Sequence, residues 1–152
     1  MDLGEVRELC IGILAKGPDI TSADSWQDST RPCGLVITYS SGARLWTAIT
    51  MAGATGTDSV RASTAPTAPL LPALYDTAGR ITPQRAQCYL AGVLMSAHAP
   101  QVISAYGYAP SAKHPGVGVH LADGGRAFLP FVFTAAPGRK PARTPFTIDA
   151  TF

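Results

Sequence analysis

The side chains best suited to acid–base or metal chemistry are three histidines, His98, His114 and His120. His114 and His120 are six positions apart, across an expected loop and strand, which is not a standard zinc-ligand spacing. With Cys33 and Asp123 they would form a thiol or metal site only if the fold brought them together. The simpler interpretation puts His98 at a helix end, His114 in a loop and His120 on the solvent side of a strand. The sequence therefore predicts no catalytic residue and no metal ligand.

Motifs that bind nucleotides or activate a nucleophile are absent from the sequence. The chain has no GxxxxGK[ST] phosphate loop, no HExxH and no GxSxG. A GxG occurs at 116–118, but it lies in an expected strand without the following helix that a dinucleotide site needs. The two glutamates, Glu5 and Glu8, belong to the start of an expected helix, so a paired-carboxylate hydrolase is not indicated. We expect no enzyme and no cofactor.

Composition places the chain among folded proteins that lack a membrane span. Of its 152 residues, 46% are apolar and 14% are charged, which excludes a disordered or supercharged chain. Three cysteines without a CxxC pattern indicate neither a disulfide framework nor a zinc ribbon, and they favour a reducing compartment. No apolar run approaches the about 20 residues of a membrane span. We expect no membrane partner and a location in the cytoplasm, or in the virion if a phage encodes the protein.

Apolar periodicity predicts two helices with recognisable starts. The first begins with a capping box made by Asp2 and Glu5, and the second follows Thr82 with Pro83 in its first turn. Alternating patterns predict strands within the ranges 35–40, 44–51, 101–108, 117–121 and 127–133. The polar segment 18–33 is expected to be a loop.

The second helix carries no charged residue from Ala86 to Ala97. A helix that is apolar nearly all round is buried on more than one side. We therefore expect two residues of this helix, Val93 and Leu94, to be almost completely buried. They should pack against one sheet face, which we expect to be lined by Leu35, Ile37 and Phe131.

These elements predict an α+β fold of two helix–β-hairpin units around one mainly antiparallel sheet, with the helices on one face. We expect a single domain over 1–136, with unit 1 at 1–52, a long loop at 53–81 and unit 2 at 82–136. Residues 137–152 are expected to be a basic connector and an extended, strand-like C-terminal arm. The two hairpin sequences, 34–56 and 116–138, align without a gap. That alignment is compatible with an internal duplication and equally with the turn glycines that any two hairpins share.

The preferred functional hypothesis is a non-enzymatic assembly subunit of a homo-oligomeric particle, such as a phage head–tail or tail ring component. Apolar residues in the long loop and in the arm suit contacts with neighbouring subunits. Truncation after Arg143 is accordingly expected to leave the domain folded and to weaken assembly. The predicted partner interface consists of Leu71, Tyr75, Phe146, Ile148 and Phe152.

The alternative hypothesis is a small nucleic-acid-binding protein of a mobile element. Strand alternation places two arginines and two aromatic residues on one sheet face: Arg44, Trp46, Arg126 and Phe128. Basic and aromatic groups interleaved on a sheet can stack bases and pair with phosphates. The simpler interpretation is that the rings pack across strands beneath solvated arginine stems. The net charge of +2 favours that simpler interpretation, which leads us to expect no specific binding at physiological salt.

Overall fold

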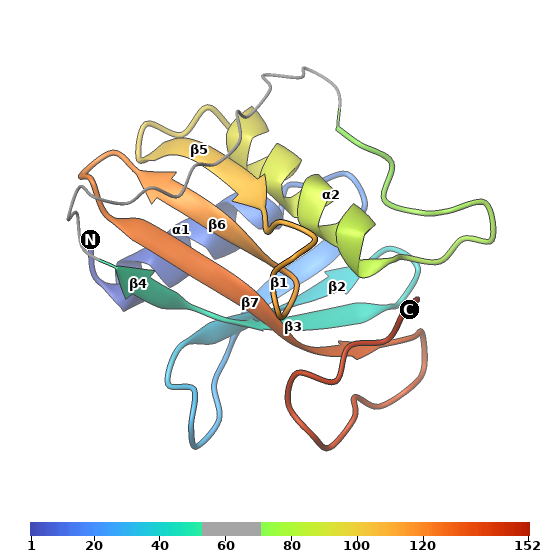
Figure 1. The fold of residues 1–152 in the computed structure, drawn as a ribbon. Helices are drawn as coiled ribbons and strands as arrows, with labels where there is room; N and C mark the ends of the chain where they lie inside the picture. Colours follow the sequence, from blue (N-terminus) through green and yellow to red (C-terminus); the bar gives the residue numbers. More distant parts are fainter. Residues whose placement is uncertain (53–70) are drawn as a thin grey trace.

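A computed structural model describes residues 1–52 and 71–152 of the chain (Figure 1). Residues 53–70, which make up most of the predicted long loop 53–81, lie outside the described residues. The described elements are α1 (Leu3–Leu14), β1 (Ile20–Trp26), β2 (Gly34–Tyr39), β3 (Arg44–Ala48), β4 (Thr50–Ala52), α2 (Pro83–Ser96), β5 (Val102–Gly107), β6 (Gly116–Leu121) and β7 (Arg126–Ala135).

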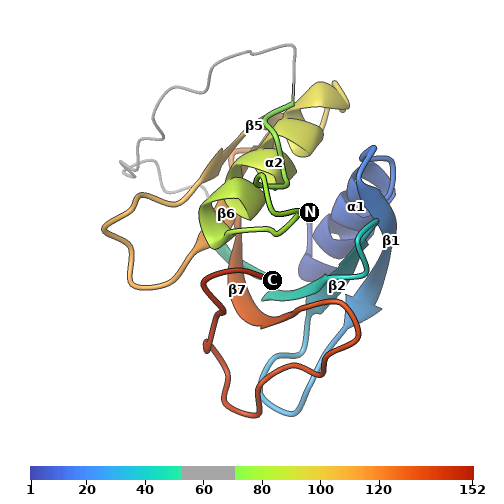
Figure 2. The ribbon, with the colours of Figure 1, turned by 90° about the vertical axis from the view of Figure 1, so that its right-hand side faces the viewer.

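The strands form one antiparallel sheet in the order β1-β2-β3-β7-β6-β5, with β4 also paired to β7. The sheet curls into a half-barrel, and both helices lie inside its curve (Figure 2). This confirms the expected α+β class and the mainly antiparallel sheet. We call the sheet face turned away from the helices the outer face.

Both helices begin where the sequence predicts. The Asp2 carboxylate accepts a hydrogen bond from the Glu5 backbone N–H at 2.8 Å, and the Glu5 side chain accepts from the Asp2 N–H at 2.9 Å. The Thr82 hydroxyl accepts from the Arg85 N–H at 3.2 Å. These contacts satisfy backbone donors that a helix leaves unpaired in its first turn. Within the part of the chain that the structure describes, no helix has the length and apolar character needed to span a bilayer.

The expected loop at 18–33 is wrong, because it contains the edge strand β1. Only two of its residues, Ile20 and Ala23, are buried, and a register shift lies between Ile20 and Ser22. An edge strand with polar residues toward solvent and an irregular register has no clear period-two signal. Four strands, β1 to β4, therefore follow α1, and three, β5 to β7, follow α2; the predicted helix–hairpin unit at the N-terminus lacked the edge strand β1.

The expected core is confirmed. Leu35, Thr47 and Phe131 are register partners across β2, β3 and β7, and none of the three is exposed. On α2, Val93 is 5% exposed and Leu94 is 1% exposed. The helix is buried on a second side as well, because Leu71 and Pro72 lie against Gly92. The two described residues 71 and 72, which precede α2, therefore pack against their own chain.

The C-terminal tail does not extend away from its own sheet as expected. The Phe146 N–H donates to the Val132 carbonyl at 2.8 Å, and Thr147 forms a parallel bridge with Phe133. Phe152 and Ile81 exchange two backbone hydrogen bonds, of 2.9 and 3.0 Å, and Phe152 is only 2% exposed. The apolar surface that the tail requires is supplied by the domain itself.

Candidate functional site

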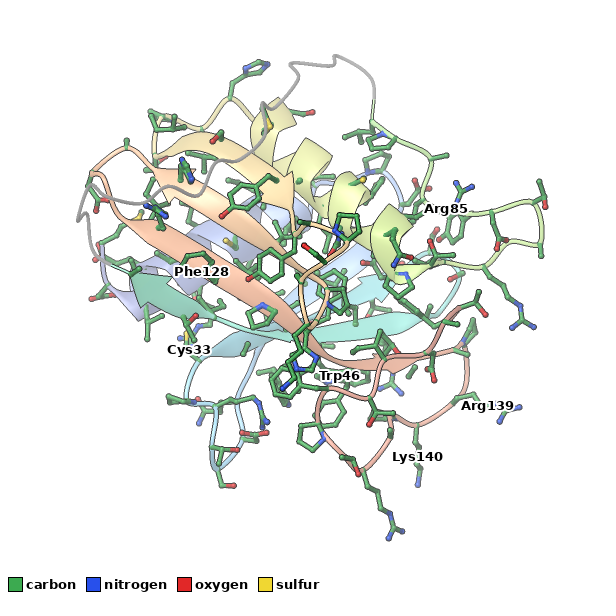
Figure 3. The ribbon with its side chains drawn as sticks, viewed as in Figure 1. Cys33, Trp46, Arg85, Phe128, Arg139 and Lys140 are labelled. Carbon is green, nitrogen blue, oxygen red and sulfur yellow. The ribbon has the colours of Figure 1, made fainter. Side chains whose placement is uncertain are left out.

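The outer face carries all four residues of the predicted nucleic-acid surface. Arg44 and Trp46 of β3 are opposite Ala135 and Phe133 of β7. Arg126 and Phe128 of β7 are opposite Ala52 and Thr50 of β4. Register partners point to the same side of a sheet, and the core side is occupied by the alternate residues of these strands. Figure 3 shows Trp46 and Phe128 on the side that faces the viewer.

At one end of this face, three rings pack together. The Trp26 and Trp46 rings each meet Phe133 edge to face, with centroids 6.0 and 6.3 Å apart. The Arg44 guanidinium lies 4.9 Å from the Trp46 ring centroid and donates to the Arg139 carbonyl at 2.8 Å. Trp46 is only 8% exposed as a result. For Trp46, the structure agrees with cross-strand packing beneath an arginine stem.

Three loops meet beside these rings. Phe146 stacks on His114 of the β5–β6 loop, with ring centroids 4.6 Å apart, and the Arg31 guanidinium of the β1–β2 loop lies 5.3 Å from its ring. Phe146 has φ +64°, a backbone conformation that bulky residues adopt only where their surroundings impose it. Stacking on both neighbours, together with the hydrogen bond to Val132, supplies that constraint. Sequence reasoning did not link Arg31 or His114 to this surface, because no local pattern joins three separate loops.

We call five cations at this end of the molecule the basic end. Arg44 and Arg139 are joined by a hydrogen bond, Arg31 contacts Phe146, and the remaining two lie in the same exposed connector. Figure 3 shows that Arg139 and Lys140 project away from the body. The members are Arg31, Arg44, Arg139, Lys140 and Arg143.

Three carboxylates lie near the five cations of the basic end: Asp28, Asp24 and Asp149, the last of which is bonded to the Thr134 hydroxyl of β7. Asp28 pairs with Arg31 at 2.8 Å. Partial desolvation opposes ionisation, but hydrogen bonds from the backbones of Arg31 and Thr30 and from the Arg31 side chain lower the pKa of Asp28. Asp24 is exposed on the outer face, opposite Val36. Cations therefore remain in excess at this end.

A second group of rings lies at the other end of the outer face. Tyr106 and Phe128 flank Gly118 in register, and a side chain at Gly118 would collide with the Tyr106 ring. Tyr108 covers Gly116 in the same way. Both tyrosine rings therefore lie across β6, because its glycines leave the space. We call Tyr106, Tyr108 and Phe128 the aromatic row; all three are half-buried.

His120 lies beside the aromatic row and contacts the Tyr106 ring. Its ring meets Tyr106 edge to face at 5.6 Å, and its Nε2 is buried without a hydrogen-bond partner. Burial raises the pKa of Tyr106 and, together with the neighbouring Tyr106 phenol, that of Tyr108. Both phenols are therefore neutral donors at physiological pH.

The predicted partner interface is not assembled into one surface. Leu71 lies against α2, the Tyr75 hydroxyl contacts Ser40 at 2.7 Å, and Phe146 is held between His114 and Arg31. Ile148 packs half-buried against the core, and Phe152 is inside it. Because its own chain covers it, Phe152 has no exposed surface to offer a partner.

The possible thiol or metal cluster does not form in the described residues. Cys33 is buried, with its Sγ 3.6 Å from the Leu3 carbonyl, whereas His114 stacks on Phe146. Asp123 pairs with the N-terminal ammonium group at 2.9 Å. Across residues 1–52 and 71–152, no three His, Cys, Asp or Glu side chains gather in a metal-binding arrangement.

Comparison of the chain with protein-family models, with curated proteins and with solved structures finds no match.

Proposed function

We propose that the protein binds nucleic acid through the outer face, with the basic end contacting phosphates. The observation that carries this proposal is the convergence of five cations and stacked rings from β3, two loops and the connector. Arginine and lysine beside aromatic rings are the groups that nucleic-acid surfaces use. The proposal adopts the alternative hypothesis of the sequence analysis.

The overall charge of +2 understates the charge of this surface. Three carboxylates lie on or just before α1, inside the curve of the sheet: Asp2, Glu5 and Glu8. The N-terminus and the connector lie at opposite sides of the molecule in Figure 1. Local potential, rather than net charge, governs attraction of a polyanion within a Debye length of about 8–10 Å.

Two arguments that favoured an assembly subunit lose their support. The C-terminal tail buries its last ring in its own core, and the second side of α2 is covered by residues 71 and 72 of the same chain. Neither feature needs a neighbouring subunit. The outer face, by contrast, has no helix packed on it among the described residues.

A salt titration tests the proposal. We expect a labelled oligonucleotide to bind with an affinity that falls steeply with salt, since each phosphate contact contributes about 0.7–0.9 to the slope of log K against log salt. Charge reversal of Arg139→Glu with Lys140→Glu should weaken binding and reduce that slope by about 1.5. Fluorescence anisotropy measures both quantities.

The matched control is Lys16→Glu with Arg80→Glu, which changes the net charge equally at two exposed positions outside the basic end. It should leave most of the binding and the slope intact. Equal loss in both double variants would mean that only net charge matters, and the basic end would not be the binding surface.

A second candidate function is the assembly subunit predicted from the sequence, now placed at a different surface. Strand β5 forms one edge of the sheet, and Ile103 on it is 65% exposed. A strand edge that no other described strand pairs with, together with an exposed apolar side chain, suits pairing with a second copy. The phage particle as its setting stays a prediction.

Light scattering after size-exclusion chromatography tests this candidate. If β5 mediates self-association, the protein elutes as an oligomer and Ile103→Lys elutes as a monomer, because a charge on the edge opposes strand pairing. Ile103→Val, which keeps an apolar β-branched residue, should remain oligomeric. A monomeric parent protein at all concentrations would rule out the assembly function.

A further inference from the structure

We propose that the aromatic row binds unpaired bases, so that the ligand of the outer face is single-stranded rather than duplex nucleic acid. This inference rests on the proposed function and names its substrate class. The row supplies stacking surfaces, whereas the basic end supplies phosphate contacts. Each part therefore makes a different contribution to binding.

The first support is the shape of the aromatic row. Gly118 lies between Tyr106 and Phe128 in register, and the Tyr106 ring covers it. Neighbouring strands are about 4.8 Å apart, so these two residues are about 10 Å apart across β6. Since no side chain rises from the glycine between them, the surface is low and lined by rings, which suits a planar base.

The second support comes from the other half of the sheet. Extended backwards, the gapless alignment of the two hairpins pairs Trp26 with Tyr108 and Gly34 with Gly116. The structure repeats the contact, because a side chain at Gly34 would collide with the Trp26 ring. In that half a planar cation, Arg44, stacks over Trp46 at 4.9 Å. The hairpin alignment pairs Trp46 with Phe128, and Phe128 is more exposed to solvent than Trp46.

The third support is the kind of nucleic acid that such a surface can use. In a duplex the base faces are stacked on one another, so rings on a sheet would meet only backbone and groove edges. Single strands present every base face, and each base stacked on an aromatic ring is worth about 1–3 kcal/mol. Half-buried rings on the same sheet face as a basic end therefore favour a single strand.

The experiment compares single-stranded and duplex oligonucleotides of equal length at one salt concentration. The probes are oligodeoxythymidylate, oligouridylate and a mixed-sequence duplex of about 16 nucleotides, the upper end of single-strand site sizes. The test variant is Phe128→Leu, which keeps apolar bulk but removes the ring. Phe128→Trp is the rescue variant, and thermal melting verifies that both are folded.

We expect tighter binding to a single strand than to the duplex and a loss of about 5- to 150-fold for Phe128→Leu, the equivalent of one stacked base. Phe128→Trp should restore binding, and the salt slope should stay unchanged in both variants. The DNA and RNA probes show which backbone is preferred.

Two outcomes would overturn the inference, and they are distinguishable. Equal binding to the duplex, or full affinity in folded Phe128→Leu, would remove the base-stacking role and leave the proposed nucleic-acid function standing. Absence of binding to every probe, at low salt as well, would remove the proposed function and this inference together.

Discussion

Replacing Leu94 with alanine should destabilise the protein by about 2–5 kcal/mol, the range for deleting a buried leucine side chain. Leu94 is 1% exposed on α2, in the core that the curled sheet closes around both helices. The surrounding backbone is held by sheet and helix hydrogen bonds, so the cavity closes only partly. Thermal denaturation should record a fall of about 2–4 °C for each kcal/mol lost, as is usual for a chain of this size.

Ile103→Ala is the control for this substitution. It also removes an aliphatic side chain, but one that is 65% exposed at the sheet edge, so its effect should stay within about 0.5 kcal/mol. If Leu94→Ala melted at the parent temperature, the assignment of α2 to the core would be wrong.

The helices and the central strands could be predicted because their signals are local. Asp2 and Thr82 mark helix starts by side-chain chemistry that acts within one turn. Leu35 and Ile37 alternate with half-buried neighbours on β2, which has one face on the core. The same reasoning failed for β1, whose exposed residues outnumber its two buried ones.

The candidate site was only half predictable. Strand alternation was enough to place Arg44, Trp46 and Phe128 on one face, because alternation survives any tertiary arrangement of the strands. Burial of Trp46 beneath Arg44, and the meeting of Arg31 with Phe146, depend on loops far apart in the sequence. No pattern within a single segment encodes such contacts.

The tail illustrates a different limit of sequence reasoning. Alternating apolar residues indicated that 146–152 needs an apolar surface, and that requirement is met. The local sequence pattern, however, does not determine which surface the tail occupies. β6 pairs with β7 only as far as Pro130, so the far end of β7 keeps a free edge there, and Thr147 bridges Phe133 on it. The Thr134 hydroxyl and the Asp149 carboxylate, 3.0 Å apart, add a polar contact.

Phe152→Ala should therefore destabilise the folded protein by about 3–5 kcal/mol, the range for removing a buried phenylalanine. The ring is 2% exposed and lies 6.5 Å from the Tyr39 ring, centroid to centroid. Chemical denaturation monitored by circular dichroism measures the loss.

Truncation after Arg143 should cost at least as much, because it also removes the backbone bonds of Phe152 with Ile81 and exposes that buried isoleucine. This reverses the sequence-based expectation that the shortened domain stays fully folded. Lys140→Ala, in the exposed part of the connector, is the control and should leave stability unchanged within about 0.5 kcal/mol. If the truncated chain unfolded at the same denaturant concentration as the full chain, the tail would contribute nothing to the core. Its apolar residues would then again need a neighbouring subunit to explain them.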